Sequence, residues 1–599
     1  MQAASIAAAA APTRSLSSST AVNAAAASQT LSPYPPGRSR HLIPPSAADI
    51  ASGKGYAALT ASFRWPHIEA GVTHYNIGVD ISDKWARDPT WADKPALIYE
   101  ETDAAGSPGG EVVICSFAQS ARLSDLLGYA LQHKLGLLSG DRVAILMSQS
   151  IETALVHTAV YKTGAVAVPL FILFGPEALE YRLADSGAKV VMVEPSKLEE
   201  VMALKSSGRL PELKHIVVAP PLAAMRFEEM AAGMPGASTA SAATQLPTET
   251  VAGVHHLSTL LADAQASDAS SRFRAAHTKL DDPALIIYTS GTTGPPKGAL
   301  HAHRVLLGHM PGVEFPHEFF PQYAKNGQQS GGDLFWTPAD WAWIGGLIDV
   351  LLPSLHHGVP VYACRFKKFD PELAFSIIER RGIRNMFMPP TALKLMRTVN
   401  TPEKRWPNMR VRSIGSGGES LGESLLEWGR QSFSGVTINE FYGQTECNLV
   451  LGNCSTLFPT RAGSMGKPIP GHVVHVVDLE GRPLPDGEVG NIGVRAPHPV
   501  MMLRYWNKPA ATADKYAGSY LLTGDLAKRD ADGYFTFFGR GDDVIKSSGY
   551  RIGPAEIEEC LMRHPAVQNV AAVGVPDELR GERVKVYIVL RPGALDKSV

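Results

Sequence analysis

A loop rich in glycine, serine and threonine constrains this chain more than any other stretch. It runs from Tyr288 to Gly298 with the sequence YTSGTTGPPKG and follows the apolar run Ala284–Ile287. The apolar run predicts a buried strand, and the glycines after it leave the backbone free to curl with its N–H groups pointing inward. Inward N–H groups form a nest that binds phosphate oxygens, and hydroxyl and ammonium groups add further donors. The residues that we expect at this phosphate loop are Thr289, Ser290, Gly291, Thr292, Thr293, Gly294 and Lys297.

The common P-loop pattern does not describe this stretch. That pattern ends in Gly-Lys-Ser/Thr, whereas Lys297 lies between Pro296 and Gly298. A surface turn would have a similar composition, because small and polar residues are typical of loops. Phosphate binding is therefore an expectation that other stretches must support.

The bulk composition excludes several classes of protein. The chain has 599 residues, enough for more than one domain. Lys and Arg number 56 and Asp and Glu 58, a net charge of −2, so nothing indicates a general nucleic-acid or membrane-surface binder. No apolar run is long enough to cross a bilayer. The 5 cysteines lack paired metal-ligand spacing, which favours a reducing, intracellular setting, and we expect the cytoplasm.

The first 60 residues read as a disordered, low-complexity leader. They are rich in Ala, Ser and Pro, and the first acidic residue is Asp49. Such a composition buries too little apolar surface to order itself, so we expect order to begin near Phe63. Residues 1–48 carry no acidic residue, which also resembles a transit peptide and would place the protein in the mitochondrial matrix. Arg14 is the only basic residue before Arg38, which favours a plain disordered tail.

Strands and helices alternate after the leader. Helical apolar spacing covers Ser124–Leu138 and Glu152–Lys162. Short apolar runs predict strands at Arg142–Leu146, Ala165–Val168, Val190–Val193 and His215–Val218. This alternation predicts an α/β fold built on a parallel sheet with helices on both faces.

Two later stretches carry acidic residues that suit a nucleotide. Asn439–Glu446 reads NEFYGQTE, and Tyr520–Leu526 reads YLLTGDL. Magnesium, which accompanies nucleotide phosphates, prefers carboxylate oxygens and retained water, so Glu446 suits a metal ligand. The hydroxyl of Thr445 can donate to a phosphate, and a carboxylate at a strand end, Asp525, can accept two hydrogen bonds from ribose hydroxyls.

The order and spacing of these stretches resemble the adenylate-forming synthetases, a superfamily of acyl-CoA synthetases, luciferases and peptide-synthetase adenylation domains. The resemblance covers roughly Phe63 to Val599. It implies a large N-terminal domain over 61–541 with parallel-rich sheets and a distorted barrel subdomain. It also implies a small, mobile α+β C-terminal domain that is only partly present over 542–599. The implied reaction uses ATP, Mg²⁺ and coenzyme A to turn a carboxylic acid first into an acyl-adenylate and then into an acyl-CoA.

The resemblance also assigns roles residue by residue. Phe335–Gly346 would border the acyl site, and Asp542 would be the hinge between the domains. Catalytic roles fall on Thr445, Glu446, Arg551 and Lys297, with Glu446 as the metal ligand. Beyond the phosphate loop, nucleotide and coenzyme A contacts fall on Gly418, Glu419, Ser420, Tyr442, Gly443, Gln444, Asp525, Arg540 and Gly549.

Two features bear on the substrate. Tyr75–Ile77 and Val79–Trp85 resemble medium-chain acyl-CoA synthetases. Acetate-selective relatives carry a tryptophan where this chain has Gly443, so the resemblance implies an acyl chain longer than acetate. We therefore expect a medium-chain or branched fatty acid and predict that Gly443→Trp shifts the preference towards shorter acids.

The chain departs from the family near its last residue, Val599. The synthetases carry a Pro-x-x-x-x-Gly-Lys loop whose lysine acts in adenylation, and no such segment precedes Val599. We therefore expect either a fragment of a longer protein or a deficit in the first half-reaction, where one lost charge stabiliser typically costs on the order of 10²–10³ in rate. An aromatic-acid CoA ligase and a non-catalytic acyl-nucleotide binding protein stay open as alternatives.

Overall fold

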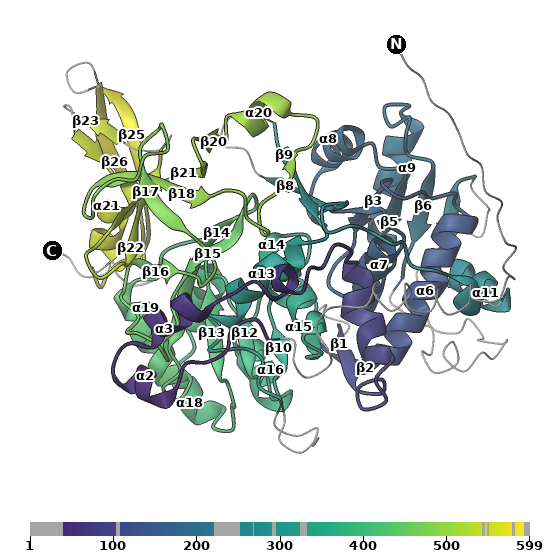
Figure 1. Ribbon diagram of the computed structural model, residues 1–599, viewed down its shortest axis with the longest axis horizontal. Coiled ribbons are helices and arrows are strands. Elements are labelled where there is room, and N and C mark those ends of the chain that lie inside the picture. Colours follow the sequence, from purple (N-terminus) through teal and green to yellow (C-terminus); the bar gives the residue numbers. More distant parts are fainter. Residues whose placement is uncertain are drawn as a thin grey trace, which may run out of the picture.

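The computed structural model describes residues 40–102, 108–220, 252–267, 269–289, 295–323, 332–541, 545–547, 550–562, 564–577 and 581–591. Within them, the strands form three sheets of 14, 8 and 4 members. Figure 1 shows the two large sheets in the body of the molecule and the small C-terminal sheet, in yellow, at one end. This is the mixed α/β arrangement that the sequence predicts.

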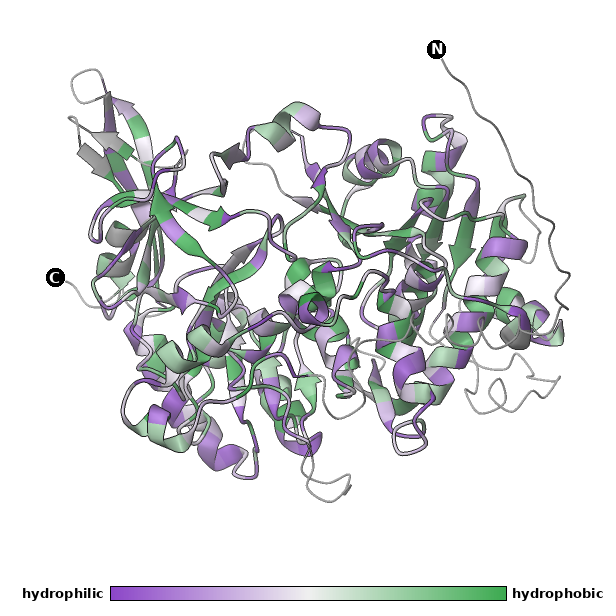
Figure 2. Cartoon of the chain, in the orientation of Figure 1, coloured by the Kyte–Doolittle hydropathy of each residue, from purple (hydrophilic) through white to green (hydrophobic). Residues whose placement is uncertain are grey.

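The eight-stranded sheet carries the expected alternation of strands and helices. Its central members β4, β3, β5, β6 and β7 are parallel, whereas β8 and β9 form an antiparallel hairpin. In sheet order the strands are β19 (Arg504–Tyr505), β9 (Lys297–Ala302), β8 (Pro283–Thr289), β4 (Val166–Pro169), β3 (Arg142–Leu146), β5 (Val190–Val193), β6 (His215–Val218) and β7 (Val254–His256). Figure 2 shows these strands as predominantly hydrophobic, as expected where both faces are covered.

Helices cover both faces of this sheet. The helices of one core cluster are α6 (Phe117–His133), α7 (Ile151–Lys162) and α11 (Leu257–Ala266), and those of the other are α8 (Pro176–Ser186) and α9 (Leu198–Ser206). Helix α6 begins seven residues before the predicted Ser124, because Ser116 and Gln119 form a reciprocal capping box at its start.

The 14-stranded sheet changes character along its length. From β1 through β11, β10, β12 and β13 to β14 the neighbours are parallel, and from β14 onward they are antiparallel. Its strands in order are β17 (Val474–Val477), β18 (Val489–Arg495), β21 (Tyr520–Arg529), β22 (Phe535–Arg540), β16 (Ser464–Pro468), β15 (Asn448–Gly452), β14 (Ile438–Gln444), β13 (Ser413–Ser416), β12 (Asn385–Phe387), β10 (Phe335–Trp336), β11 (Val361–Cys364), β1 (Pro95–Thr102) and β2 (Pro108–Ser116), with β20 (Tyr516–Ala517) beside β21. The parallel part packs on α16 (Pro371–Arg380), α17 (Pro390–Met396) and α19 (Glu423–Ser432).

The small C-terminal sheet is antiparallel. Its strands are β24 (Tyr550–Ile552), β23 (Ile545–Ser547), β26 (Gly581–Leu590) and β25 (Val567–Asp577), and α21 (Pro554–Met562) precedes β25. This segment therefore combines a helix with antiparallel strands, as expected for a small α+β domain. The expected C-terminal boundary at 542 falls on residues outside the described ranges.

Residues 40–62 belong to the fold, although the sequence predicts a disordered leader there. They include α2 (Ala47–Ala51) and α3 (Gly55–Ser62), the purple segment that crosses the body in Figure 1. The backbone N–H groups of His41 and Leu42 donate to the carboxylate of Glu314 at 2.9 and 2.6 Å, and Leu42 is buried. Local composition could not reveal these long-range contacts, and residues 1–39 of the expected leader lie outside the described residues.

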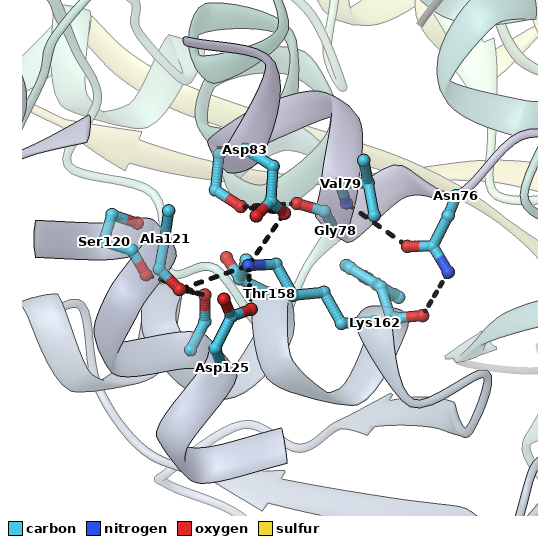
Figure 3. A network of polar contacts seen from close by, with 12 residues as sticks. Asn76, Gly78, Val79, Asp83, Ser120, Ala121, Asp125, Thr158 and Lys162 are labelled. Atoms are coloured by element: carbon cyan, nitrogen blue, oxygen red, sulfur yellow. Dashed lines mark hydrogen bonds and ion pairs between the residues drawn. The ribbon is translucent and has the colours of Figure 1, made fainter. Parts of the chain in front are cut away.

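A buried lysine ties α7 to its neighbours. Figure 3 shows the ammonium of Lys162 between the carboxylates of Asp83 and Asp125, at 2.8 and 2.7 Å. The ammonium also donates to the carbonyl of Ala121 at 3.2 Å. These contacts join α7 to α6 and to the π-helical turn η1 (Val79–Asp83), and they satisfy a charge that burial would otherwise make costly.

In the described part of the chain, no helix combines the length and the hydropathy that crossing a membrane requires. All five cysteines are free thiols, and only Cys560 is exposed.

Candidate active site

A pocket of about 300 Å³ opens where the large sheet turns from parallel to antiparallel. It lies past the carboxyl end of β13, which is where open α/β sheets commonly bind ligands. Its lining residues are Gly418, Glu419, Ser420, Glu440, Phe441, Tyr442, Gly443, Gln444, Met465, Asp525, Phe537 and Arg540. The structure therefore brings together eight of the predicted nucleotide-site residues from four separate stretches of sequence.

Asp525 lies at the centre of the polar contacts in this pocket. Its Oδ2 accepts hydrogen bonds from the hydroxyl of Tyr442 at 2.6 Å and from Nε2 of Gln444 at 2.5 Å. Its Oδ1 lies 3.3 Å from Nη1 of Arg540. Asp525 lies within β21 and pairs across to Arg540 on β22, so strand register, and not the predicted strand end, places the two side by side.

The turn after β13 forms one wall of the pocket. Gly418 has φ = +102°, a conformation that favours glycine. Oε2 of Glu440 accepts a hydrogen bond from the backbone N–H of Leu421 at 3.0 Å, which fixes the turn from inside. At the rim, Oε2 of Glu419 pairs with the ammonium of Lys394 at 2.9 Å. Gly418 adds no side chain to this wall, so an aromatic base can lie close to the backbone there.

Gly443 is held by the backbone that faces it. A Cβ at this position would lie 2.0 Å from the carbonyl oxygen of Asn448, at the register shift between β14 and β15. The glycine is therefore required by close backbone approach. The prediction for Gly443→Trp assumed free volume on the pocket side. Because the new Cβ would meet Asn448, the substitution would also have to displace β15.

Glu446 is buried and follows the pocket residue Gln444 by two positions. It is held by a contact that could not be predicted from the sequence. Its Oε1 accepts a hydrogen bond from the hydroxyl of Tyr505. Burial, and then the nearby Glu446 carboxylate, raise the pKa of Tyr505, so the hydroxyl keeps its proton and donates. The two residues are 59 positions apart, and Tyr505 reaches Glu446 because β19 pairs with β9. No motif in the sequence signals that pairing.

Lys297 is the first residue of β9 and lies next to Tyr505. Its ammonium lies 5.3 Å from the centre of the Tyr505 ring. Thr289 and Lys297 are register partners across the β8–β9 hairpin, and the hydroxyl of Thr289 donates to the carbonyl of Lys297 at 3.3 Å. Ser290, Gly291, Thr292, Thr293 and Gly294 lie outside the described residues. The two ends of the phosphate loop are thus fixed by the hairpin on which Lys297 lies.

Several predicted residues cannot be placed at the pocket. Asp542 and Gly549 lie outside the described residues, and only the backbone of Arg551 is described, in β24 opposite Lys546. Thr445 is half-buried between Gln444 and Glu446.

The predicted acyl-site stretch packs beside the phosphate-loop hairpin. The ring of Trp343 lies 5.5 and 5.8 Å from those of Phe171 and Phe174. The guanidinium of Arg182 stacks 4.0 Å from Phe174 and 5.7 Å from Tyr288. Within this stretch, burial raises the pKa of Asp340 to about 6. Aromatic rings joined by the Arg182 guanidinium therefore connect Trp343 of the acyl-site stretch to Tyr288 of the phosphate-loop strand.

The donors and acceptors present fit a nucleotide with magnesium. The buried Oε1 of Gln444 in the pocket accepts no hydrogen bond from the described residues, although buried polar atoms are normally paired. Asp525 offers a carboxylate to hydroxyl groups, and Arg540 offers a cation. Glu446 supplies a carboxylate oxygen of the kind that magnesium prefers.

Comparison with known proteins agrees with this geometry. The sequence matches the AMP-binding enzyme family over residues 84–506 and the AMP-binding enzyme C-terminal domain over residues 556–599. It is 31% identical to the acyl-CoA ligase YtcI of Bacillus subtilis (strain 168) over 509 residues, which cover 83% of each chain. It is 30% identical to the human mitochondrial acyl-coenzyme A synthetase ACSM4 over 527 residues, 86% of this chain and 81% of that one.

A solved structure shares the fold over most of the chain. The crystal structure of the anthranilate CoA ligase AuaEII in complex with anthranoyl-AMP aligns with a TM-score of 0.69 at 26% identity, covering 87% of each chain. The family match spans more than half of the sequence and includes the phosphate-loop hairpin, the turn after β13 and Glu446. The chain therefore belongs to the AMP-binding enzyme family, as an ATP-dependent acid–CoA ligase.

Proposed function

We propose that this protein activates a medium-chain or branched fatty acid with ATP and transfers the acyl group to coenzyme A. The observation that carries the proposal is the pocket in which Gly418–Ser420, Tyr442–Gln444 and Asp525 meet. A carboxylate oxygen of the acid attacks the α-phosphorus of ATP, and pyrophosphate leaves. The thiol sulfur of coenzyme A then attacks the acyl carbonyl carbon, and AMP leaves.

Each pocket residue has a proposed task in this reaction. The turn at Gly418, Glu419 and Ser420 takes the adenine, and the Asp525 carboxylate accepts hydrogen bonds from the ribose hydroxyls. Arg540 balances that carboxylate and faces the ribose or phosphate. Thr445 and Lys297 contact the phosphates, where preorganised donors stabilise developing charge.

Glu446 would hold magnesium, directly or through water. When bound, the metal supplies positive charge against the phosphate oxygens. The phosphate loop would complete this environment with the donors of Ser290, Gly291, Thr292, Thr293 and Gly294.

The second half-reaction would use the small C-terminal domain. We propose that it turns about Asp542, that Arg551 faces the ATP phosphates before the turn, and that Gly549 lines the pantetheine path after it. Gly549→Leu should then slow coenzyme A-dependent AMP release but leave acid-dependent pyrophosphate exchange near the wild-type rate. Equal loss of both activities would contradict this division of labour.

The acyl group is the least constrained part of the proposal. The aromatic surroundings of Trp343 support an apolar acid, and the human relative ACSM4 is named an acyl-coenzyme A synthetase. An aromatic acid is the second candidate, because the structural neighbour AuaEII is an anthranilate CoA ligase with anthranoyl-AMP bound.

A panel of acids separates these candidates. The protein is incubated with ATP, Mg²⁺ and coenzyme A and with acetate, hexanoate, octanoate, isovalerate, benzoate or anthranilate, and AMP release is measured. The proposal predicts the highest kcat/KM for a medium-chain or branched acid. Preference for benzoate or anthranilate would replace it with an aromatic-acid ligase, and nucleotide binding without turnover of any acid would support a non-catalytic binding protein.

We also propose that the protein acts in the cytoplasm. Its five free cysteines support a reducing compartment. The alternative is the mitochondrial matrix, and the name of the human relative includes the word mitochondrial. Fractionation of cells that express the full chain with a C-terminal tag should recover it with cytosolic markers, and recovery with matrix markers would contradict this.

A further inference from the structure

Tyr505 lies between the two charged residues on which adenylation is proposed to depend. Its hydroxyl donates to Oε1 of Glu446, and its ring face lies 5.3 Å from the ammonium of Lys297. Tyr505 itself is only 2% exposed. Its packing therefore fixes where the hydroxyl can point.

Two strand contacts set the position of Tyr505. β19 pairs antiparallel with β9, with Tyr505 opposite Ala299 and Arg504 opposite Leu300. Lys297 is two residues before Ala299, so it is the diagonal neighbour of Tyr505 on the same face of the sheet, within reach of a long side chain.

Backbone contacts on both sides of Tyr505 hold this segment in place. The N–H of Met502 donates to the backbone carbonyl of Glu446 at 2.8 Å, and the N–H of Trp506 donates to the carbonyl of Gly298 at 2.7 Å. The backbone of Tyr505 itself donates to the hydroxyl of Thr512 at 3.0 Å. The segment 502–506 is thus bonded to the chain beside Glu446 and to the chain beside Lys297.

The hydrogen bond leaves the two oxygens of Glu446 unequal. Oε1 accepts the hydrogen bond from Tyr505, and within the described part of the chain no hydrogen bond reaches Oε2. A carboxylate that is free to rotate would present either oxygen, so fixing one oxygen presents the other. Hydrogen bonds of this kind orient metal ligands, and their loss typically lowers metal affinity by about 10–100-fold.

We propose that Tyr505 is a positioning residue that holds the Glu446 carboxylate so that Oε2 faces the magnesium of bound ATP. This inference rests on the proposed role of Glu446 and adds a residue on which that role depends. Tyr505 touches neither the reacting atoms nor the nucleotide in this account. It acts through Glu446, so its effect should appear only when magnesium is present.

Binding measurements without acid or coenzyme A test this directly. The affinity for ATP is measured by calorimetry in Mg²⁺ and again in EDTA, for the wild type, Tyr505→Phe and Tyr534→Phe. Tyr534 is the matched control, because it is also buried and its hydroxyl donates to the carbonyl of Pro459 at 2.7 Å. Tyr505→Phe should weaken binding in Mg²⁺ by about 10–100-fold and leave binding in EDTA unchanged, whereas Tyr534→Phe should change neither.

The EDTA measurement also reports folding, because an unfolded variant would bind ATP in neither buffer. In that case Tyr505→His decides the question, since its ring N–H can still donate to Glu446. It should retain more of the magnesium-dependent affinity than Tyr505→Leu, which has no donor. Equal affinities for the His and Leu variants, or a wild-type ratio of Mg²⁺ to EDTA affinity in Tyr505→Phe, would overturn the proposal.

Glu446→Gln separates failure of this inference from failure of the site assignment. If Glu446→Gln loses the magnesium effect and Tyr505→Phe does not, only the positioning role is wrong. If Glu446→Gln also keeps the magnesium effect, the metal is held elsewhere and both statements fail. In the double variant, Tyr505→Phe should cause no loss beyond that of Glu446→Gln, because the hydroxyl acts through the carboxylate.

Discussion

Replacing Asp525 with Asn should specifically remove the recognition of ribose. The carboxylate has hydrogen bonds from Tyr442 at 2.6 Å and Gln444 at 2.5 Å and lies 3.3 Å from Arg540. The amide keeps the size of the side chain but removes the charge and one acceptor. A hydrogen bond to a charged group is worth about 1.5–3 kcal/mol, so ATP affinity should fall by roughly 10–150-fold.

Calorimetry with ATP and with 2′,3′-dideoxy-ATP assigns this loss to the ribose. The wild type should bind ATP more tightly than the dideoxy analogue, and Asp525→Asn should bind the two almost equally. The informative quantity is the coupling free energy between the Asp525→Asn substitution and the removal of the ribose hydroxyls from the ligand. Asp486→Asn is the matched control, because its partner Arg529 is also on β21 but the pair is about one third exposed, and exposed pairs contribute less than about 1 kcal/mol.

The opposite result would refute the reasoning. If Asp525→Asn weakens ATP and dideoxy-ATP by the same factor, the carboxylate supports the pocket without contacting the ribose. A thermal melt of the same variant checks the alternative that the pocket has collapsed. Loss of the partners of Arg540 and Tyr442 should cost about 1–3 kcal/mol of stability, which leaves a folded protein to assay.

Three further predictions concern packing and pH. Gly443→Ala forces a Cβ within 2.0 Å of a backbone carbonyl, so urea unfolding should show a loss of about 1–3 kcal/mol, and an unchanged midpoint would contradict the close approach. Lys162→Met leaves two carboxylates without their shared ammonium and should lower the free energy of unfolding by about 3–5 kcal/mol. Arg405→Met, at an exposed pair, should lower it by less than about 1 kcal/mol. Equal losses in the two variants would contradict the argument from burial. Burial lowers the pKa of His157 and His303 to about 3. As the pH falls below about 6.5, these two side chains therefore take up protons in the unfolded chain but not in the folded one. Together they should lower the free energy of unfolding by about 4 kcal/mol between pH 7.5 and pH 5. Urea midpoints at the two pH values measure that loss, and replacing both histidines by glutamine should reduce it; an unchanged pH dependence in the double variant would contradict the assignment.

The sequence predicted the parts of the fold that depend on local patterns. The strands Val190–Val193 and His215–Val218 have the predicted bounds, because a fully buried parallel strand is a short apolar run with polar ends. It located α6 less well, since the capping box at Ser116 lies outside the apolar spacing. It missed the order of residues 40–62, where the backbone N–H of Leu42 donates to Glu314, 272 positions away.

The same distinction holds for the candidate site. Motifs predicted eight of the twelve residues that line the pocket, because Gly418, Tyr442 and Asp525 lie in stretches that can be recognised by themselves. They could not predict Tyr505, which reaches Glu446 only through the pairing of β19 with β9. They also gave an incomplete reason for Gly443, whose environment depends on the backbone of Asn448 across a register shift.

The central claim is that separate segments of this chain form one site for an activated acid. The most direct test is a crystal structure of the protein with a non-hydrolysable acyl-adenylate analogue. The account predicts the adenine against Gly418–Ser420, the ribose hydroxyls on Asp525 and the acyl chain directed towards Trp343. An analogue bound away from Asp525, or absent from the pocket at saturating concentration, would contradict it.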